Sequence, residues 1–460
     1  MRLLALSVLA FPTLLAAQRR HPTAPPAPPE PPGHIAFEEF TLPNGLRVIY
    51  SEDHSDPIVS VDVWYETGSR NERPGRSGFA HLFEHMMFQG SAHIKKAEHS
   101  RLMERAGGQD NGSTTEDRTN YFETVPSNRL NLALWAEADR MRSLAITQEN
   151  FDNQRQAVKE ERRLRIDNQP YQQAFTDGLT LPFDSAACFP YAHTVIGSMA
   201  DLDSAKLPDV QAFFDTYYAP NNATLVVVGD FAPVDLRRLV NQYFAGVPSH
   251  PAPEAPRCQV APSTAARRRE VHDAHANLDA VLRMYRIPEH RGADTPAIEI
   301  LNIILGQGES SRLNVAVVRR AKAAVATGTI LNPYGSRNGP GVWVIYGIVN
   351  QGISADTLDG ALGTQLDSIR ANGISAAELE KAKNVLRAGF IGNRETTLGK
   401  AEELHHYRTF HNTLDEINSD LDRMLAVTSD DVKRVANTYL APNNLTLVIV
   451  RAGPAAGGAQ

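Results

Sequence analysis

The stretch Asp209–Val228 reads DVQAFFDTYYAPNNATLVVV, and 222 residues later Asp431–Val450 reads DVKRVANTYLAPNNLTLVIV. Each copy has the pattern of a helix, a Pro-Asn-Asn turn and a buried strand. The offset is about half of the 460-residue chain, so the repeat indicates that one unit of helices and strands was duplicated.

Composition outlines the segments that flank the two units. Residues 1–17 have a basic Arg2 and a short apolar run, which predict a secretory signal peptide cleaved near Gln18 and an exported, periplasmic or secreted protein. A mitochondrial presequence is the competing interpretation, but it would have more Ser and more spaced Arg. Along the chain we expect these segments: a Pro-rich spacer at 18–34, a first domain at 35–246, a linker at 247–264, a second domain at 265–453 and a tail at 454–460.

Charge and cysteine content narrow the class of protein. A net charge of −7 argues against a nucleic-acid binder, and the apolar run at the N-terminus is too short for a transmembrane anchor. Since Cys188 and Cys258 are the only cysteines, any metal site must use His and carboxylate ligands. The two cysteines could pair in an oxidising compartment, but separate thiols are slightly favoured because one lies in the predicted linker.

The stretch Gly78–Gly90, GFAHLFEHMMFQG, contains His81, Glu84 and His85 in the order H-x-x-E-H. Its apolar residues predict a helix, on which side chains four residues apart lie on one face. Two imidazoles at that spacing can bind one metal ion, and Glu84 lies beside the metal, where a general base is placed. The order is the inverzincin motif. Because such His pairs also occur without metal, a third ligand is decisive.

A catalytic zinc site needs a third protein ligand and an open position. The helix predicted from Glu149 to about Ile166 carries Glu160 and Glu161, and spacing alone does not choose between them. Residues 107–125 are polar and rich in threonine, which predicts a hairpin or an edge strand. The free backbone groups of an edge strand can pair with an extended peptide, although an edge strand without any partner is an equally expected alternative.

The stretch Gly78–Glu161 resembles the pitrilysin/insulinase family of zinc peptidases, especially its bacterial branch similar to mitochondrial processing peptidase. Glu161 lies 76 residues after His85, the spacing at which that family has its third ligand. The resemblance therefore implies one Zn²⁺ per chain, held by His81, His85 and Glu161, with Glu84 as the catalytic base. It also implies an α+β fold of two homologous α/β-roll units, each a mainly antiparallel sheet covered by helices.

The resemblance extends to residues that bind substrate. Asn111 and Thr114 lie in a segment that looks like the family's Asn-Ala-x-Thr edge strand, which holds the substrate backbone. Arg312 matches a substrate-binding Arg of the second unit, but the Tyr expected with it is missing near Val325. A surface charge at a helix end is an equally expected role for Arg312. Gln154 stands where family members often have a second Glu that supports the metal site.

These features predict a zinc-dependent endopeptidase that hydrolyses peptide bonds in unfolded peptides held as an added β-strand. The resemblance implies a chamber of four units, and this chain has two. A homodimer or a heterodimer with a homologous metal-free subunit is therefore expected, and the missing Tyr favours the second. The alternative is a non-catalytic peptide-binding or scaffold subunit of the same fold. Such subunits lack one or more of the metal-site residues, all of which are present here.

Overall fold

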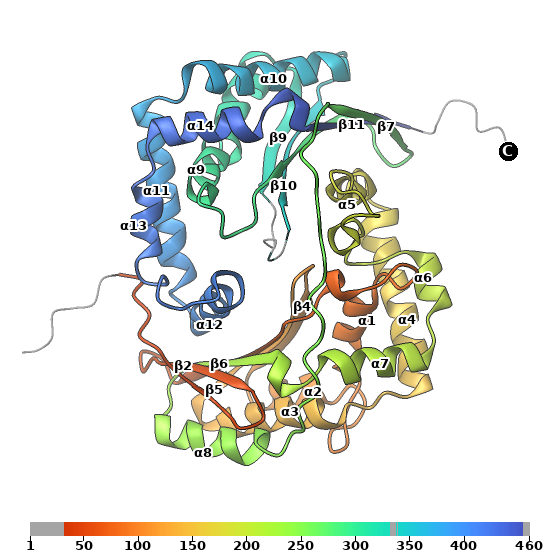
Figure 1. Ribbon diagram of the computed structural model, residues 1–460, viewed down its shortest axis with the longest axis vertical. Coiled ribbons are helices and arrows are strands. Elements are labelled where there is room, and N and C mark those ends of the chain that lie inside the picture. The colour runs from red at the N-terminus through yellow and green to blue at the C-terminus, as the bar shows by residue number, and fades with distance from the viewer. Residues whose placement is uncertain (1–31, 332–336, 338, 454–460) are drawn as a thin grey trace, which may run out of the picture.

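The computed structural model describes residues 32–331, 337 and 339–453, which form two units, one above the other in Figure 1. The predicted signal peptide, nearly all of the predicted spacer and the predicted tail lie outside these residues. Each unit is built on one sheet: a six-stranded sheet of order β1-β2-β6-β3-β5-β4 and a five-stranded sheet of order β7-β11-β8-β10-β9. The α+β class expected from the sequence is confirmed.

Both sheets have the same arrangement of strand directions. In the part of the chain that the structure describes, β2–β6 and β7–β11 are the parallel pairs, and the other neighbours are antiparallel. The strands are β1 (Glu38–Thr41), β2 (Arg47–Glu52), β3 (Ile58–Tyr65), β4 (Gln109–Thr114), β5 (Thr119–Pro126), β6 (Ala223–Gly229), β7 (Arg267–Asp273), β8 (Ala280–Ile287), β9 (Ala324–Leu331), β10 (Gly341–Val349) and β11 (Leu445–Ala452).

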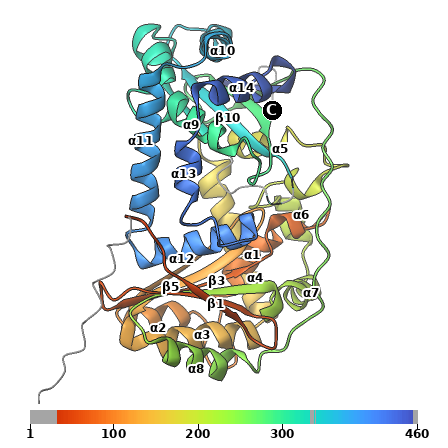
Figure 2. The same cartoon turned by 60° about the vertical axis from the view of Figure 1, so that its left-hand side comes forward.

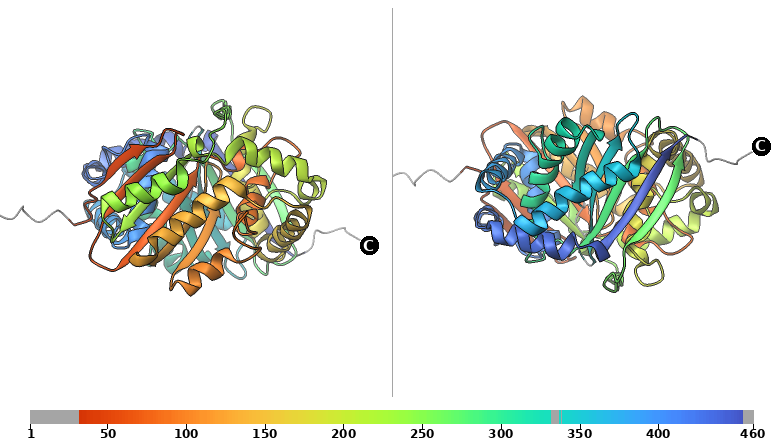
Figure 3. Two further views of the ribbon diagram at one scale, coloured as in Figure 1. Left: turned by 90° about the horizontal axis from the view of Figure 1, so that it is seen from below. Right: turned by 90° about the horizontal axis from the view of Figure 1, so that it is seen from above.

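Helices cover the outer face of each sheet. Seen from below, α3 and α8 lie across the first sheet, and seen from above, α10 and α14 lie across the second (Figure 3). The helices are α1 (Phe79–Met86), α2 (His99–Arg105), α3 (Leu130–Ser143), α4 (Gln148–Arg162), α5 (Gln172–Thr180), α6 (Met199–Ser204), α7 (Leu207–Tyr217), α8 (Pro233–Phe244), α9 (Thr295–Gly306), α10 (Ala355–Asn372), α11 (Ala376–Asn393), α12 (Thr397–His406), α13 (Asp420–Leu425) and α14 (Ser429–Tyr439). Turns of π-helix extend α4 over 163–167 and α12 over 407–411.

The repeated sequence has the same conformation in both units, because its asparagine closes the same turn. Asn222 Nδ2 donates a hydrogen bond of 2.8 Å to Tyr217 O at the end of α7. Asn444 Nδ2 donates one of 2.7 Å to Tyr439 O at the end of α14. Each bond satisfies a carbonyl that the helix end leaves free. The strands that follow, β6 and β11, each lie between a parallel and an antiparallel neighbour, as a duplication requires.

The two units exchange a helix. Helix α12 packs on β3 and β6 of the first sheet (Figure 2), and α5 packs on β8 and β11 of the second. In the first contact, Val226 and Val228 share a buried cluster with Ala401 and Leu404. In the second copy of the repeat, the residues that correspond to α5 lie 222 positions later, at 394–402. This range overlaps α12, so the exchange is symmetric. Each half therefore completes the other's apolar core.

The predicted linker is tied to the first unit. Cys188 and Cys258 form a disulfide, and the N–H of Gln259 donates a backbone hydrogen bond of 3.0 Å to the carbonyl of Ala187. The slight preference for separate thiols was wrong. The proline content of this segment predicted a linker, but it carried no information on the surface along which the linker packs.

Among the described residues, no helix is both long enough and apolar enough to cross a membrane.

Candidate active site

The motif helix α1 is positioned by the residues before it. Gly78 has a φ of +87°, and a Cβ there would lie 2.8 Å from the carbonyl oxygen of Ile196, so the position favours glycine. The carboxylate of Glu72 accepts hydrogen bonds from the N–H groups of Gly78 and Ala80 at 2.9 and 2.7 Å. These bonds satisfy donors that the start of a helix leaves free. The apolar side of α1 then packs into the core with these residues buried: Phe79, Leu82, Phe83 and Met86.

The opposite side of α1 brings two imidazoles to one carboxylate. His81 Nε2 lies 3.6 Å and His85 Nε2 lies 3.1 Å from Glu161 Oε2. Glu161 is on α4, which packs against α1. Ligand atoms about 2 Å from one zinc ion in a tetrahedron lie roughly 3.3 Å apart. The two nitrogens and the oxygen therefore have spacings that fit one Zn²⁺.

Glu160 lies in a different environment. Its side chain is 58% exposed and pairs with Arg163 at 3.0 Å, on the same helix. Glu161, which is 18% exposed, faces the imidazoles. Of the two adjacent acids left open by their spacing, the structure brings Glu161 to the histidines.

The protonation states of His81 and Glu161 suit a metal site. Burial and the neighbouring His85 lower the pKa of His81 to about 4, so its ring is neutral at pH 7. The hydrogen bond with His85 lowers the pKa of Glu161, which stays ionised. Neutral imidazole and ionised carboxylate are the states that bind zinc. His81 Nδ1 is buried and has no hydrogen-bond partner among the described residues.

Gln154 contacts the ring nitrogen of His85 that does not face Glu161. Its Oε1 lies 3.3 Å from His85 Nδ1. If the amide oxygen accepts the Nδ1–H, the lone pair of Nε2 faces Glu161, which is the tautomer a metal ligand needs. The family resemblance predicted a supporting Glu here. The amide has an oxygen in position for that contact but has no charge.

Glu84 does not contact Glu161 as the two imidazoles do. It contacts the edge strand β4 instead. Thr114 Oγ1 donates a hydrogen bond of 2.6 Å to Glu84 Oε2. A Cβ on Gly112 would lie 3.3 Å from Glu84 Cγ, so the backbone of β4 passes close to this side chain. Burial raises the pKa of Glu84, and the bond from Thr114 opposes that rise.

The segment 107–125 forms a hairpin, as predicted, and β4 is the outer strand of the first sheet. Asn111 is opposite Phe122, and Thr114 is opposite Thr119. The side chain of Asn111 is exposed, and its Oδ1 accepts the N–H of Gly112 at 2.9 Å. Because β4 is hydrogen-bonded to a strand on one side, its other edge can pair with an extended chain.

Arg312 is placed away from the motif residues. Its Nε and Nη2 bond the two oxygens of Glu378 at 2.8 and 2.7 Å. Glu378 also accepts the N–H of Ser375 at the start of α11. The guanidinium of Arg312 is thus paired with Glu378 within the second unit. Val325, near the position where the family has its Tyr, lies on β9 and is 47% exposed.

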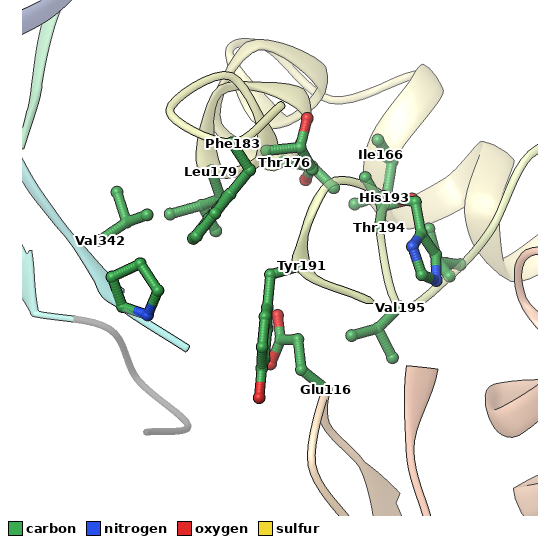
Figure 4. Close-up of a pocket in the computed structure, with 13 residues that line it drawn as sticks. Glu116, Ile166, Thr176, Leu179, Phe183, Tyr191, His193, Thr194, Val195 and Val342 are labelled. Carbon is green, nitrogen blue, oxygen red and sulfur yellow. The ribbon is translucent and has the colours of Figure 1, made fainter. Parts of the chain in front are cut away.

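A cavity of about 240 Å³ is lined by residues of both units, and the sequence alone did not indicate it. It includes Ile166, from the π-helical turn that extends the helix of Glu161. In Figure 4, Val342 of the second unit lies on one side, with Tyr191 and Glu116 in the middle. Burial raises the pKa of Glu116 to about 7. The other labelled residues that line the cavity are Thr176, Leu179, Phe183, His193, Thr194 and Val195. They come from separate segments, so the sequence alone did not place them around one cavity.

Comparisons with known proteins agree with this geometry. The family model described as Insulinase (Peptidase family M16) matches residues 47–181, and the model described as Peptidase M16 inactive domain matches 204–386. The zinc protease PqqE of Helicobacter pylori is 30% identical over 418 residues, which are 90% of this chain and 92% of that protein. A probable mitochondrial-processing peptidase subunit beta of Arabidopsis thaliana is 23% identical over 430 residues, 88% and 77% of the two chains. The crystal structure of a protease from Helicobacter pylori has a TM-score of 0.86 and 30% identity, and covers 91% of this chain and 99% of that one.

An H-x-x-E-H helix, a converging Glu and a duplicated α+β unit define a class of zinc peptidases. The chain belongs to the insulinase family of zinc proteases, peptidase family M16. The predicted family, with relatives among bacterial zinc proteases and mitochondrial processing peptidases, is confirmed.

Proposed function

We propose that the chain is a zinc-dependent endopeptidase that cleaves unfolded peptides. The observation that carries the proposal is the convergence of His81 Nε2 and His85 Nε2 on Glu161 Oε2, with Glu84 beside them. Two imidazoles and one carboxylate are the protein ligands of several catalytic zinc sites. Membership in a family of zinc proteases supports the same metal.

His81, His85 and Glu161 would hold one Zn²⁺ per chain. When bound, zinc acts as a Lewis acid that polarises a carbonyl and lowers the pKa of water. Glu84 is the general base in this proposal. Thr114 fixes its Oε2, so Oε1 takes a proton from the attacking water and passes it to the leaving amine. Burial raises the pKa of Glu84, which brings it nearer to the pH at which proton transfer in both directions is efficient.

The substrate peptide would add to β4 as a further strand. Backbone pairing fixes an extended chain and is insensitive to side chains, and Asn111 and Thr114 lie on the strand that would form the pair. Unfolded peptides can present an extended backbone with free N–H and C=O groups, whereas strands inside folded domains already have theirs paired. Efficient cleavage of a tightly folded protein without loops would contradict this preference.

A second chain would complete the chamber. The chain has two units, and its Arg312 is paired with Glu378, so a partner has to supply the further substrate contacts. A homologous metal-free subunit fits that need, and a homodimer is the alternative. The disulfide between Cys188 and Cys258 supports export to an oxidising compartment, periplasmic or extracellular.

Comparison of the wild type with Glu84→Gln tests the proposal. With a quenched peptide as substrate, we expect the variant to keep its zinc and to lose activity by a factor on the order of 10² to 10⁴. The control is Glu104→Gln, at an exposed position on α2, which should cleave at the wild-type rate. Unchanged cleavage by Glu84→Gln would remove Glu84 from its role. A zinc-loaded wild type with no cleavage of any unfolded peptide would favour the scaffold alternative.

A further inference from the structure

A second group of possible metal ligands lies in the other half of the chain. His290 is in the segment between β8 and α9, His406 is the last residue of α12, and His411 ends the π-helical turn that follows α12. The Nε2 atoms of His290 and His406 lie 2.9 Å apart. One ring nitrogen from each of the three residues lies within 4.8 Å of the others, the same limit that the cluster of His81, His85 and Glu161 satisfies.

The orientation of His411 is fixed by an acid. Its Nδ1 lies 2.8 Å from Glu416 Oε2. A carboxylate at that distance accepts the Nδ1–H and leaves Nε2 with a free lone pair. Imidazole ligands of metals generally have their other nitrogen bonded in this way. Glu416 thus supplies the supporting contact that the cluster requires.

The other two rings are neutral and enclosed. Burial and the neighbouring His411 lower the pKa of His290 to about 4, and burial and His290 lower the pKa of His406 well below its usual value. Phe410 packs against both rings, with centroid distances of 5.6 and 5.1 Å. Neutral imidazoles are ready to bind a metal without losing a proton.

Nearby charged groups are already engaged. Asp420 accepts a hydrogen bond of 2.7 Å from the Tyr407 hydroxyl and pairs with Arg423 at 2.6 Å. Burial raises the pKa of Glu299 to about 7, with Asp420 adding to the rise. Asp420 is thus held by two other groups, and the three imidazoles are the donor set that converges. A set of three imidazoles with a position open for water is a known zinc ligand set, and imidazole also suits Cu²⁺ and Ni²⁺.

We infer that His290, His406 and His411 form a second metal site, for a divalent transition-metal ion such as Zn²⁺. The ion would join the segment after β8 to α12. Because α12 packs on β3 and β6, the ion would fasten the helix that covers the first sheet to the second unit. The role is structural, and the site does not depend on whether the protein is a peptidase.

Zinc content measured on the full chain, without a polyhistidine tag, tests the site. After removal of metal, reloading with zinc and gel filtration, we expect two zinc ions in the wild type. His85→Ala and His290→Ala should each hold one, and the double variant should hold none. His275→Ala, at an exposed histidine on the same unit, should hold two. If His290→Ala holds as much zinc as the wild type, the inference is overturned.

A second measurement covers the case in which His290→Ala does not fold. The His85→Ala chain has its motif site disabled and an intact three-histidine cluster. Adding micromolar zinc to this metal-free chain should raise its Tm, and Co²⁺ should give visible absorption bands typical of nitrogen ligands. A Tm that does not change with zinc would contradict the inference. Absence of peptidase activity in the wild type, with the zinc counts as expected, would contradict the proposed function alone.

Discussion

Thr114 on β4 donates a hydrogen bond of 2.6 Å to the carboxylate of Glu84 on α1. The bond connects the strand proposed to hold the peptide with the side chain proposed to move the proton. It also opposes the rise in the pKa of Glu84 that burial causes. Substrate position and base strength therefore depend on one hydroxyl group.

Replacing Thr114 by Val should move the acid side of the pH profile. Without the hydroxyl, the ionised form of Glu84 loses a hydrogen bond and its pKa rises further. The base works only when ionised, so kcat/KM should begin to fall at a higher pH than in the wild type. Thr114→Ser keeps a hydroxyl and should retain the wild-type profile. An acid limb at the same pH in Thr114→Val would show that the bond does not tune Glu84.

Glu160 and Glu161 form a matched pair for testing the third ligand. Glu161→Gln removes the charged oxygen that faces both imidazoles, and bound zinc should fall by about one equivalent relative to the wild type after dialysis. Glu160→Gln removes a side chain that pairs with Arg163 at the surface, and zinc content should not change. Metal analysis of the two purified variants measures the difference. Equal zinc in both would exclude Glu161 as a ligand.

Gln154 should determine how tightly the metal is held. Gln154→Leu removes the acceptor near His85 Nδ1, and loss of such a supporting contact typically weakens metal affinity by about 10- to 100-fold. Gln154→Glu restores the family's acid and should bind zinc at least as tightly as the wild type. Competition with a chelator of known affinity gives both constants. Equal affinity in Gln154→Leu and the wild type would contradict this role.

The disulfide should contribute measurably to stability. It closes a loop of 70 residues, for which chain entropy predicts a stabilisation of up to about 4 kcal/mol. Dithiothreitol should lower the Tm of the wild type and leave a Cys188→Ala/Cys258→Ala chain unaffected. Peptide mapping of the unreduced protein should recover the two cysteines linked. Free thiols in protein purified from an oxidising compartment would contradict the pairing.

His405 on α12 should make folding sensitive to acid. Its ring stacks on Trp64 at 4.7 Å, and its Nε2 lies 3.0 Å from the carbonyl of Asp62. Burial lowers its pKa to about 3, so the folded state keeps it neutral while the unfolded chain takes up a proton below about pH 6.5. Its contribution to the free energy of unfolding is therefore present above pH 6.5 and is lost as the pH falls towards 3.

Urea unfolding of metal-free protein measures this effect. Between pH 6.5 and 4.5, the wild type should lose about 2 kcal/mol more than His405→Gln, since each pH unit costs about 1.4 kcal/mol per group. His275→Gln, at an exposed position, should follow the wild type. The same pH dependence in all three proteins would show that His405 does not take up the proton.

The sequence predicted the parts of the fold that depend on local pattern. The duplicated helix and strand, the hairpin at 107–125 and the helix that carries His81 and His85 each follow from periodicity or turn residues. Only the spacing known from the family predicted that Glu161 contacts this helix. The local sequence could not choose between Glu160 and Glu161, because the two acids are adjacent and have the same neighbours. The structure separates them by the face of α4 that each occupies.

Features that depend on the path of the chain could not be predicted in this way. The pairing of Cys188 with Cys258 requires the linker to return to the first unit. His290 lies more than a hundred residues before His406. The two meet because the end of α12 lies against the segment between β8 and α9. The exchange of α5 and α12 has no signature in either helix, since an apolar face does not specify the sheet it covers.

That exchange bears on the origin of the chain. A single ancestral unit would have had no second half in the same polypeptide to cover the inner face of its sheet. Its helix at the position of α5 would have covered the sheet of another copy, in a symmetric pair. The contact between the two halves therefore has the reciprocal arrangement of an interface between two identical subunits, but it lies at the centre of one molecule.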